Sequence, residues 1–289
     1  MYHIAVLLTC FNRREKTLKA LSHLFAAQEK EKDQIALNVY LTDDGCSDGT
    51  AEAVAKMYPE TKILQGTGDL YWAGGMRNSW QEALKGDHDA YLLLNDDTNM
   101  FANTFTDFLS THKYCLKEFK KGGIYCGATL DGETQNYSYG GHVFTNKFLA
   151  RYIKVVPNGV NPQSCELGNA NIMWVSKNVV DTIGILSDEF VHGLADFDYT
   201  LMAKKKNLPV LLAPHYLGNC SNDHTNPYIK FPSLSFKERL KMLYSPLSLD
   251  FKSNLAYNRR NFPLRLPIVF LVGYLKVLFP SLYVKRHKL

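Results

Sequence analysis

Short apolar runs alternate with longer segments of helical periodicity through the first half of this chain. The strand-length runs lie at 3–9, 36–42, 62–65, 90–95 and 123–128, and the amphipathic segments at 13–31, 48–57, 74–85 and 101–119. Apolar runs of this length bounded by turn residues predict strands, whereas apolar positions that recur every three or four residues predict helices. The alternation predicts an α/β fold, with a mostly parallel central sheet and helices on both faces.

The pattern changes character after residue 130 and then resumes. The stretch 130–165 mixes glycine, proline and aromatic residues, which predicts hairpins and loops instead of another strand–helix unit. Further strands are expected at 171–175 and 208–213, and further helices at 177–183 and 195–206. The second half is therefore expected to complete the same sheet.

The C-terminal part has a different pattern. A basic amphipathic helix is expected at 236–244, and residues 266–284 are mostly apolar but interrupted by proline, glycine and Lys276. A membrane-spanning helix needs about 20 predominantly apolar residues with few charges, so spanning is not expected. We expect a domain at 1–245 and a basic, partly apolar helical extension at 246–289 that lies on an anionic membrane surface. A helix packed on the domain or on a second subunit is the alternative.

The formal net charge of +5 is unevenly distributed along the chain. Residues 252–289 carry eight Lys and Arg residues and no Asp or Glu. The other 251 residues hold 25 of the 33 basic side chains and all 28 acidic ones, a net charge of −3. A mildly acidic domain with a basic tail differs from a uniformly basic nucleic-acid-binding protein, so no nucleic-acid partner is expected.

The overall composition is that of a globular protein, with 46% apolar and 21% charged residues. The N-terminus has no basic stretch followed by a long apolar run, so we expect no secretory signal. The six cysteines are scattered without a CxxC pair or zinc-like spacing. These features predict a cytoplasmic protein with reduced thiols.

Acidic motifs follow three of the apolar runs: Asp43-Asp44-Gly45, Asn95-Asp96-Asp97 and Asp196-Phe197-Asp198. In open α/β sheets, ligands bind beyond the carboxyl ends of the strands. Adjacent carboxylates raise each other's pKa unless a positive charge lies nearby, and their hard oxygen atoms suit Mg²⁺ or Mn²⁺. The three motifs together predict an enzyme that acts on a nucleotide-activated substrate.

Five motifs, in this order, resemble those of glycosyltransferase family 2, the inverting sugar transferases with a GT-A fold. They are Thr9-Cys10-Phe11-Asn12-Arg13, Asp43-Asp44-Gly45-Cys46-Ser47-Asp48-Gly49-Thr50, Gly75-Met76-Arg77-Asn78, Asn95-Asp96-Asp97 and Ala195-Asp196-Phe197-Asp198. The resemblance covers roughly residues 3–215. The stretch 68–77 is similar to a bacterial subgroup of surface-polysaccharide and rhamnosyltransferase-like proteins. Asn95 and Ala195 depart from the family pattern, which has an acid at each position.

The resemblance implies transfer of a sugar from a UDP- or dTDP-sugar to a hydroxyl of a glycan or lipid-linked saccharide. It assigns Asp196 as catalytic base and Asp97 as ligand of Mn²⁺ or Mg²⁺. It assigns the donor nucleotide to Thr9, Phe11, Asn12, Asp44, Gly75, Arg77 and Asp96. The basic tail places this activity at the inner face of a bacterial membrane, and the sequence leaves self-association open.

The residues themselves support several of these roles and leave alternatives. Phe11 can stack on a base or be a buried loop aromatic. Arg77, which we expect at a helix start after a glycine-rich loop, suits a diphosphate or is a surface arginine. Asp48 is expected to make turn and cap bonds. Because Asp196 and Asp198 are two residues apart on a helix, one can face the acceptor while the other braces the helix.

Several assignments stay open at this level. His192, His215 and His224 are candidates for a further role in the site, and residues 168–171 for the acceptor side. Two other functions also remain. A nucleotidyltransferase would need a glycine-rich loop with Lys or Arg right after the first strand, which Thr9–Asn12 does not provide. A nucleotide-sugar-binding module without turnover is allowed by Asn95 and Ala195.

Overall fold

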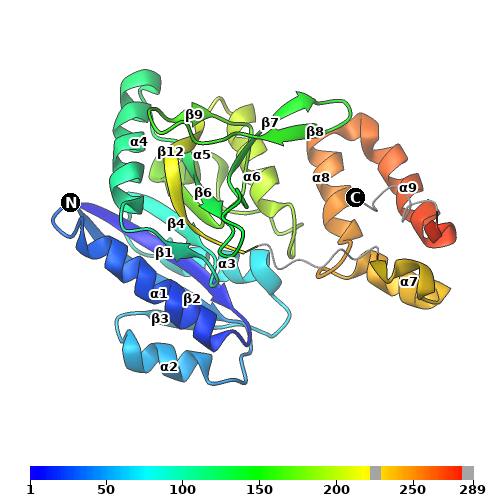
Figure 1. Cartoon of the computed structure of the whole chain (residues 1–289), viewed down its shortest axis with the longest axis horizontal. Coiled ribbons are helices and arrows are strands. Elements are labelled where there is room, and N and C mark those ends of the chain that lie inside the picture. The colour runs from blue at the N-terminus through cyan, green and yellow to red at the C-terminus, as the bar shows by residue number, and fades with distance from the viewer. Residues whose placement is uncertain (222–228, 282–289) are drawn as a thin grey trace.

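The computed structural model describes residues 1–221 and 229–281, and it shows a central sheet with helices on both faces (Figure 1). The strand order is β3-β2-β1-β4-β11-β6-β12-β5, with β9 paired to β12. The strands are β1 Tyr2–Cys10, β2 Ile35–Asp43, β3 Lys62–Gln65, β4 Ala90–Leu94, β5 Asn99–Met100, β6 Ile124–Leu130, β9 Gln163–Ser164, β11 Ile172–Ser176 and β12 Val210–Asn219. The predicted α/β architecture is confirmed.

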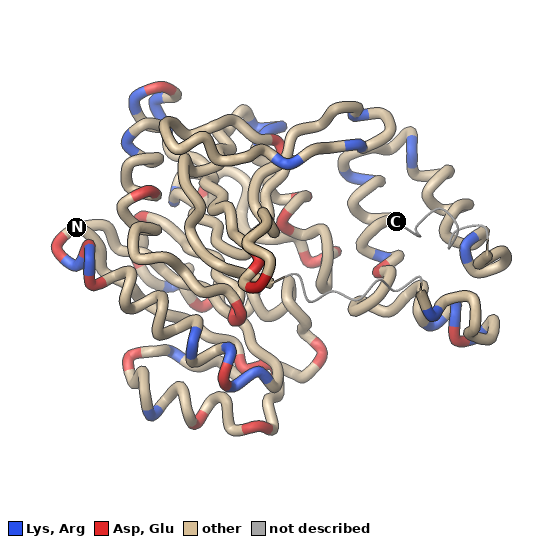
Figure 2. The backbone as a smooth tube through the Cα atoms, viewed as in Figure 1, with Lys and Arg blue, Asp and Glu red and all other residues tan. Residues whose placement is uncertain are grey.

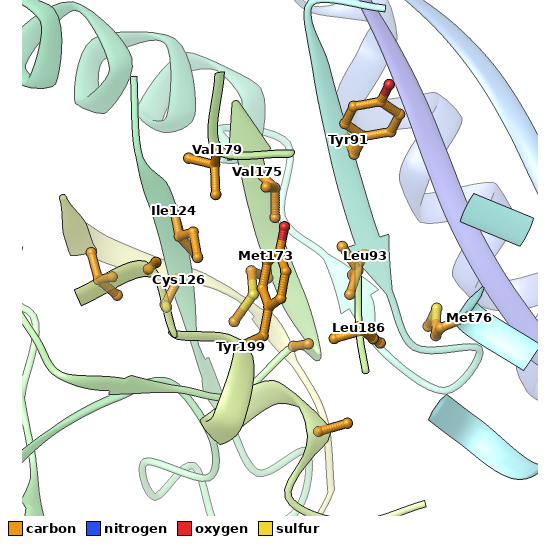
Figure 3. Packing of buried hydrophobic residues seen from close by; sticks show 14 of the residues in the cluster. Met76, Tyr91, Leu93, Ile124, Cys126, Met173, Val175, Val179, Leu186 and Tyr199 are labelled. Carbon is orange, nitrogen blue, oxygen red and sulfur yellow. The ribbon is translucent and has the colours of Figure 1, made fainter. Parts of the chain in front are cut away.

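Six helices cover the described part of this sheet: α1 Arg14–Glu29, α2 Thr50–Met57, α3 Tyr71–Ala83, α4 Thr104–Phe119, α5 Lys177–Ile183 and α6 Ala195–Lys205. Alternate residues of a strand point to opposite faces, so the apolar runs of β1 and β4 supply both layers. Ile4 and Leu92 pack with α1 and α4, whereas Leu7 and Leu93 pack with α3, α5 and α6. Figure 3 shows the second of these layers around Leu93, Met76 and Tyr199.

The short strands β5 and β9 pair antiparallel with β12, and in the middle of the sheet β11 also departs from parallel order. β1 is parallel to β2 and β4, whereas β11 runs antiparallel to both β4 and β6. Ile172, the first residue of β11, therefore pairs with Leu94, the last residue of β4. The start of β11 consequently lies at the edge where β1, β2 and β4 end.

The predicted hairpins of 130–165 form a small second sheet. It consists of β7 Gly141–Asn146, β8 Arg151–Lys154 and β10 Leu167–Gly168, in the order β10-β7-β8. β10 leads directly into the residues before β11. The small sheet therefore positions residues 169–171, which lie between β10 and β11 at the edge of the central sheet.

The C-terminal helices form a cluster beside the sheet (Figure 1). They are α7 Phe236–Tyr244, α8 Phe251–Asn261 and α9 Leu266–Leu278, with 3₁₀ turns at Phe231–Ser233 and Pro263–Arg265. Phe231, Leu243, Phe251 and Val277 form their common buried centre. The expected helical tail is present, but α7 packs with α8 and α9, while the domain boundary at residue 245 stays a prediction. Figure 2 shows Lys and Arg along α8 and α9.

Candidate active site

A cavity of about 740 Å³ opens at the edge of the sheet where β1, β2 and β4 end. Its size falls within the usual range of ligand pockets, and its place is the one where open α/β sheets bind ligands. The walls bring together residues from every acidic motif. They are Thr9, Cys10, Phe11, Arg13, Asp44, Gly68, Tyr71, Trp72, Asn95, Asp96, Asp97, Tyr139, Asn169, Ala170, Asn171, His192, Gly193, Leu194, Asp196, Phe197, Cys220, Ser221 and Leu247.

Two adjacent carboxylates follow β4 and face a single arginine. Nη1 of Arg13 donates to Oδ1 of Asp96 at 2.9 Å, and Nη2 donates to Oδ2 of Asp97 at 2.5 Å. Burial raises the pKa of Asp96 to about 7, the charge of Asp97 adds to this, and Arg13 opposes it. The paired oxygen ligands and their need for positive charge fit a divalent cation, which Asp97 would hold with Asp96 beside it.

Arg13 is a site residue that the sequence argument did not single out. It lies just before α1, in the loop that follows β1, and its motif position gave no reason to expect a contact with residues more than 80 positions away. The signal was the repulsion between Asp96 and Asp97, which requires a nearby positive charge. The sequence could therefore have predicted that some Lys or Arg in another loop at this sheet edge contacts the two carboxylates, but not which one.

Asp44 is buried at the end of β2 and organises the start of α3. Oδ1 accepts from the backbone N–H of Gly68 at 2.9 Å, and Oδ2 accepts from that of Tyr71 at 3.0 Å. A Cβ on Gly66 would lie 2.6 Å from Oδ1 of Asp44, so the loop passes too close for a side chain. Asp44 thus lines the cavity as predicted and also fixes the loop that closes one side of it.

The loop after β1 contributes to the rim of the cavity. Phe11 is 53% exposed there, which excludes the alternative of a buried loop aromatic. The side-chain oxygen of Asn12 accepts from the backbone N–H of Ser47 at 2.7 Å, so it ties this loop to the one after β2. Asp48 accepts from the N–H of Thr50, which is the expected turn bond, and from the N–H of Arg14 in the loop after β1. The expected cap is not formed, because Gly49 is the residue before α2 and no side chain caps the helix.

Gly75 and Arg77 do not lie where their predicted role requires. Helix α3 begins at Tyr71, so both residues are inside the helix and not at its start. A Cβ on Gly75 would lie 2.1 Å from Oγ1 of Thr9, so this glycine permits close packing of α3 on β1. Nη1 of Arg77 donates to the carbonyls of Ser187 at 2.9 Å and Phe190 at 2.7 Å. Neither residue lines the cavity, and the argument from a helix start is wrong.

Asp196 lies at the start of α6 and faces the cavity. Its Oδ2 accepts from Nδ2 of Asn169 at 3.4 Å and from the backbone N–H of Ala170 at 3.3 Å. Burial raises the pKa of Asp196, while these donors and the N–H of Phe197 oppose the rise. Oδ1 accepts from the backbone N–H of Phe197 at 2.8 Å, whereas both bonds to Oδ2 are long. Oδ2 of this half-buried carboxylate therefore retains capacity to accept a proton or a further hydrogen bond.

Asp198 lies two residues after Asp196 on α6 and does not line the cavity. Nε of Arg260 donates to its Oδ1 at 3.0 Å and to its Oδ2 at 3.1 Å, and Nδ2 of Asn261 donates at 2.7 Å. Asp198 therefore braces α6 against α8. The two carboxylates therefore have different surroundings, as expected, while the contact of Asp196 with an acceptor stays a prediction.

The histidines separate into different environments. His192 lines the cavity, with its ring centroid 6.4 Å from that of Tyr71. His215 lies elsewhere, with Nδ1 at 3.0 Å from Oδ1 of Asp107 on α4, so the structure does not bring it to the site. His224 lies outside the described residues. Cys220, which sequence reasoning missed, lines the cavity with Sγ 3.6 Å from Oδ1 of Asp97.

Two cysteine thiols lie close together where the loops after β1 and β2 begin. Sγ of Cys10 and Sγ of Cys46 are 3.7 Å apart, and a carboxylate oxygen of Asp43 lies within 4.8 Å of both. Burial raises the pKa of both thiols, which favours their neutral form. They fill space between the loops after β1 and β2.

Solved structures with the same fold are glycosyltransferases. A mannosyltransferase from Pyrobaculum calidifontis, PcManGT in complex with GDP-Man and Mn²⁺, superposes with a TM-score of 0.56 at 11% identity, over 97% of this chain and 71% of that chain. S. aureus TarS 1–349 in complex with UDP-GlcNAc superposes with a TM-score of 0.54 at 12% identity, over 91% of this chain and 73% of that chain. No protein-family model and no curated protein matches the sequence. The likeness shows that this chain has a GT-A-type glycosyltransferase fold.

Proposed function

We propose that the protein is an inverting, metal-dependent glycosyltransferase of family 2. It moves a sugar from a UDP- or dTDP-sugar to a hydroxyl of a glycan or lipid-linked saccharide in bacterial surface-polysaccharide synthesis. The observation that carries the proposal is the meeting of Asp44, Asp96, Asp97 and Asp196 in one cavity, from three separate places in the chain. The complexes of PcManGT with GDP-Man and Mn²⁺ and of TarS with UDP-GlcNAc support it.

The donor occupies the side of the cavity formed by the ends of β1, β2 and β4. Phe11 offers an exposed aromatic face for the base, and Asp44 offers carboxylate oxygens for a pyrimidine N3–H. Asp96 faces the ribose and Asp97 holds the divalent cation. When bound, the cation acts as a Lewis acid that stabilises the departing nucleoside diphosphate.

Asp196 is the general base on the acceptor side. It removes the proton of the acceptor hydroxyl as that oxygen forms a bond to the anomeric carbon and the bond from this carbon to the diphosphate breaks. Attack from the face opposite the leaving group inverts the anomeric centre. Asn169 and the N–H of Ala170 orient the carboxylate, and the burial that raises its pKa makes it a better proton acceptor.

A thermal-shift panel tests the donor site first. UDP, dTDP, GDP and CDP are each compared with and without Mn²⁺ or Mg²⁺, because a ligand that binds only the native state raises its stability. We expect a metal-dependent shift with UDP or dTDP that is lost in Asp97→Asn. Shifts without any turnover of the matching nucleotide sugar would favour the binding module, and the absence of any shift would count against the donor site.

We further propose that the C-terminal helices place the protein on an anionic membrane, where a lipid-linked acceptor resides. None of the helices within residues 1–221 and 229–281 has the length and apolar character needed to cross a bilayer. The side chains of Ile268 and Leu271 on α9 are 57% and 59% exposed, and Lys276 lies on the same helix. Exposed apolar side chains beside basic residues suit the surface of an anionic bilayer.

Flotation with phosphatidylglycerol vesicles tests this membrane contact. We expect the double variant Ile268→Ser/Leu271→Ser to lose most of its vesicle binding, because it removes apolar area from the proposed contact. Val160→Ser is the matched control, since Val160 is 73% exposed in a different part of the fold. Equal flotation of all three proteins would remove the role of α9.

A further inference from the structure

The guanidinium of Arg13 bridges the two carboxylates that we assign to ribose and metal. Nη1 lies 2.9 Å from Oδ1 of Asp96, and Nη2 lies 2.5 Å from Oδ2 of Asp97. The backbone of Arg13 is fixed between the loop after β1 and the first residue of α1. One positive charge therefore occupies the place in the cavity wall where the adjacent carboxylates need compensation.

The two bonds of Arg13 differ in how easily they can be given up. The side chain of Asp96 is 6% exposed and also lies 3.5 Å from Oγ1 of Thr17, whereas that of Asp97 is 17% exposed. A buried carboxylate that loses its positive partner is strongly destabilised. The bond to Asp96 is thus the permanent one, and the bond to Asp97 is the one that can be exchanged.

We propose that Arg13 is an exchangeable counter-ion, which holds Asp97 in the free protein and releases it to a divalent cation that arrives with a diphosphate. The inference rests on the proposed function for the identity of that ligand. A cation on Asp97 repels a guanidinium on the same carboxylate, so the two compete for it. The released Nη2 group keeps its place beside the cavity, and a planar guanidinium is well suited to phosphate oxygens.

This exchange couples the binding of the cation to the binding of the nucleotide. Without a diphosphate, a cation must displace Arg13 from Asp97, and the guanidinium loses this charged bond with nothing gained in return. With a diphosphate, the phosphate oxygens replace Asp97 as that partner. The cation and the nucleotide should therefore strengthen each other's binding through the protein, as any such coupling is reciprocal.

Titration of the full-length protein with Mn²⁺ alone tests the competition, by calorimetry and by the electron paramagnetic resonance signal of free Mn²⁺. We expect Arg13→Met to bind Mn²⁺ about tenfold or more tightly than the wild type, because the competing charge is gone. Arg14→Met is the matched control and should not change Mn²⁺ binding, since Arg14 is the exposed neighbour in sequence. Asp97→Asn should abolish the binding.

A second titration with UDP and Mn²⁺ together should change in the opposite direction. Arg13→Met should bind this pair about tenfold more weakly than the wild type, because the phosphate partner is missing. Arg13→Lys, which keeps the charge but cannot bridge two carboxylates, should lie between the two. A variant that is merely misfolded would weaken both titrations, so the opposite signs separate the exchange from a structural defect.

The outcomes distinguish this inference from the proposed function. If Arg13→Met binds Mn²⁺ no more tightly than the wild type while UDP still binds with metal, the exchange is overturned and the glycosyltransferase proposal stands. If neither protein binds Mn²⁺ with or without any of the four nucleoside diphosphates, the metal-dependent donor site fails and the exchange fails with it.

Discussion

At the scale of single residues, the charges of two carboxylates in one cavity, the buried Asp96 and the half-buried Asp196, are compensated in different ways. The guanidinium of Arg13 opposes the rise in the pKa of Asp96, whereas only neutral donors from Asn169, Ala170 and Phe197 oppose the rise at Asp196. A carboxylate with no positively charged partner accepts a proton more readily than one that is paired with a guanidinium. This difference supports Asp196 as the base and Asp96 as a binding residue.

Replacing Asp196 tests that division of roles. We expect Asp196→Asn to lower the rate of sugar transfer by about 10²- to 10⁴-fold, because the amide cannot accept the proton of the acceptor. The metal-dependent thermal shift with nucleotide should be unchanged. Asp181→Asn on α5, an exposed acidic residue, is the control and should keep full activity. Normal transfer by Asp196→Asn would show that another group is the base.

His142 on β7 predicts a pH dependence of stability that is separate from catalysis. Its ring is 6% exposed and packs edge-on against Tyr152 and Phe197. Burial, with a smaller effect of Lys154, lowers its pKa from 6.5 to about 4. Between these two values the unfolded chain binds a proton that the native protein does not bind. The contribution of neutral His142 to the free energy of unfolding is therefore fully present above pH 6.5. It is lost as the pH falls toward 4, which lowers the free energy of unfolding by up to about 3 kcal/mol.

Urea unfolding at a series of pH values measures this effect. The variant His142→Phe keeps an aromatic ring of similar size but cannot take up a proton. We expect its free energy of unfolding to fall less than that of the wild type between pH 6.5 and 4. Two profiles that run parallel through this window would show that His142 does not contribute.

At the scale of elements, the packing of α3 on β1 depends on the absence of a side chain at Gly75. A Cβ there would lie 2.1 Å from Oγ1 and 2.6 Å from Cβ of Thr9, which cannot move without disturbing β1. We expect Gly75→Ala to lower the free energy of unfolding by about 1–3 kcal/mol in chemical denaturation.

The preceding glycine of α3 gives the matched control. A Cβ on Gly74 would meet Cβ of Leu70 at 3.1 Å, a neighbour within the same segment. The gain in helix propensity from Gly to Ala, up to about 1 kcal/mol, should offset that contact. Equal effects of Gly74→Ala and Gly75→Ala would contradict the assignment of Gly75 to packing.

The sequence predicted most elements because their patterns are local. The strand 62–65 and the helices 177–183 and 236–244 agree with the structure to the residue. The start of α3 was misplaced because a distant carboxylate fixes it: Asp44 accepts from the N–H of Tyr71, which has a φ of +52°. No local pattern reports such a contact. The same limitation explains why Arg13 was missed and why Gly75 and Arg77 were assigned to the nucleotide.

At the scale of the whole molecule, an ion pair with a buried carboxylate helps to join the C-terminal helices to the sheet domain. Asp198 is 2% exposed, and Arg260 of α8 contacts both of its oxygens and also Oε1 of Glu189 at 3.0 Å. We expect Arg260→Met to lower the free energy of unfolding by about 2 kcal/mol or more, because Asp198 stays buried with only Asn261 as a side-chain partner. Chemical denaturation of the two proteins measures the difference.

The neighbouring arginine serves as the control for this prediction. Arg259 pairs with Glu189, but its side chain is 59% exposed, and exposed ion pairs contribute at most about 1 kcal/mol. Arg259→Met should therefore unfold close to the wild type. If the free energy of unfolding falls equally in both variants, the cause is the loss of any positive charge on α8 and not the loss of the partner of buried Asp198.

The reversal of β11 has a consequence for how such a protein can change over evolutionary time. The loops after β1, β2 and β4 follow the ends of parallel strands, whereas residues 169–171 lead into the beginning of β11, which is antiparallel. The polypeptide before that strand, from 131 to 168, holds the small sheet and joins the main sheet through β9, which pairs with β12. The hairpin of β7 and β8 can therefore lengthen or shorten without altering the register of the three parallel strands. The residues on the β11 side of the cavity can therefore change in evolution while the ends of β1, β2 and β4 stay the same, so the proposed acceptor side can diverge independently of the proposed donor side.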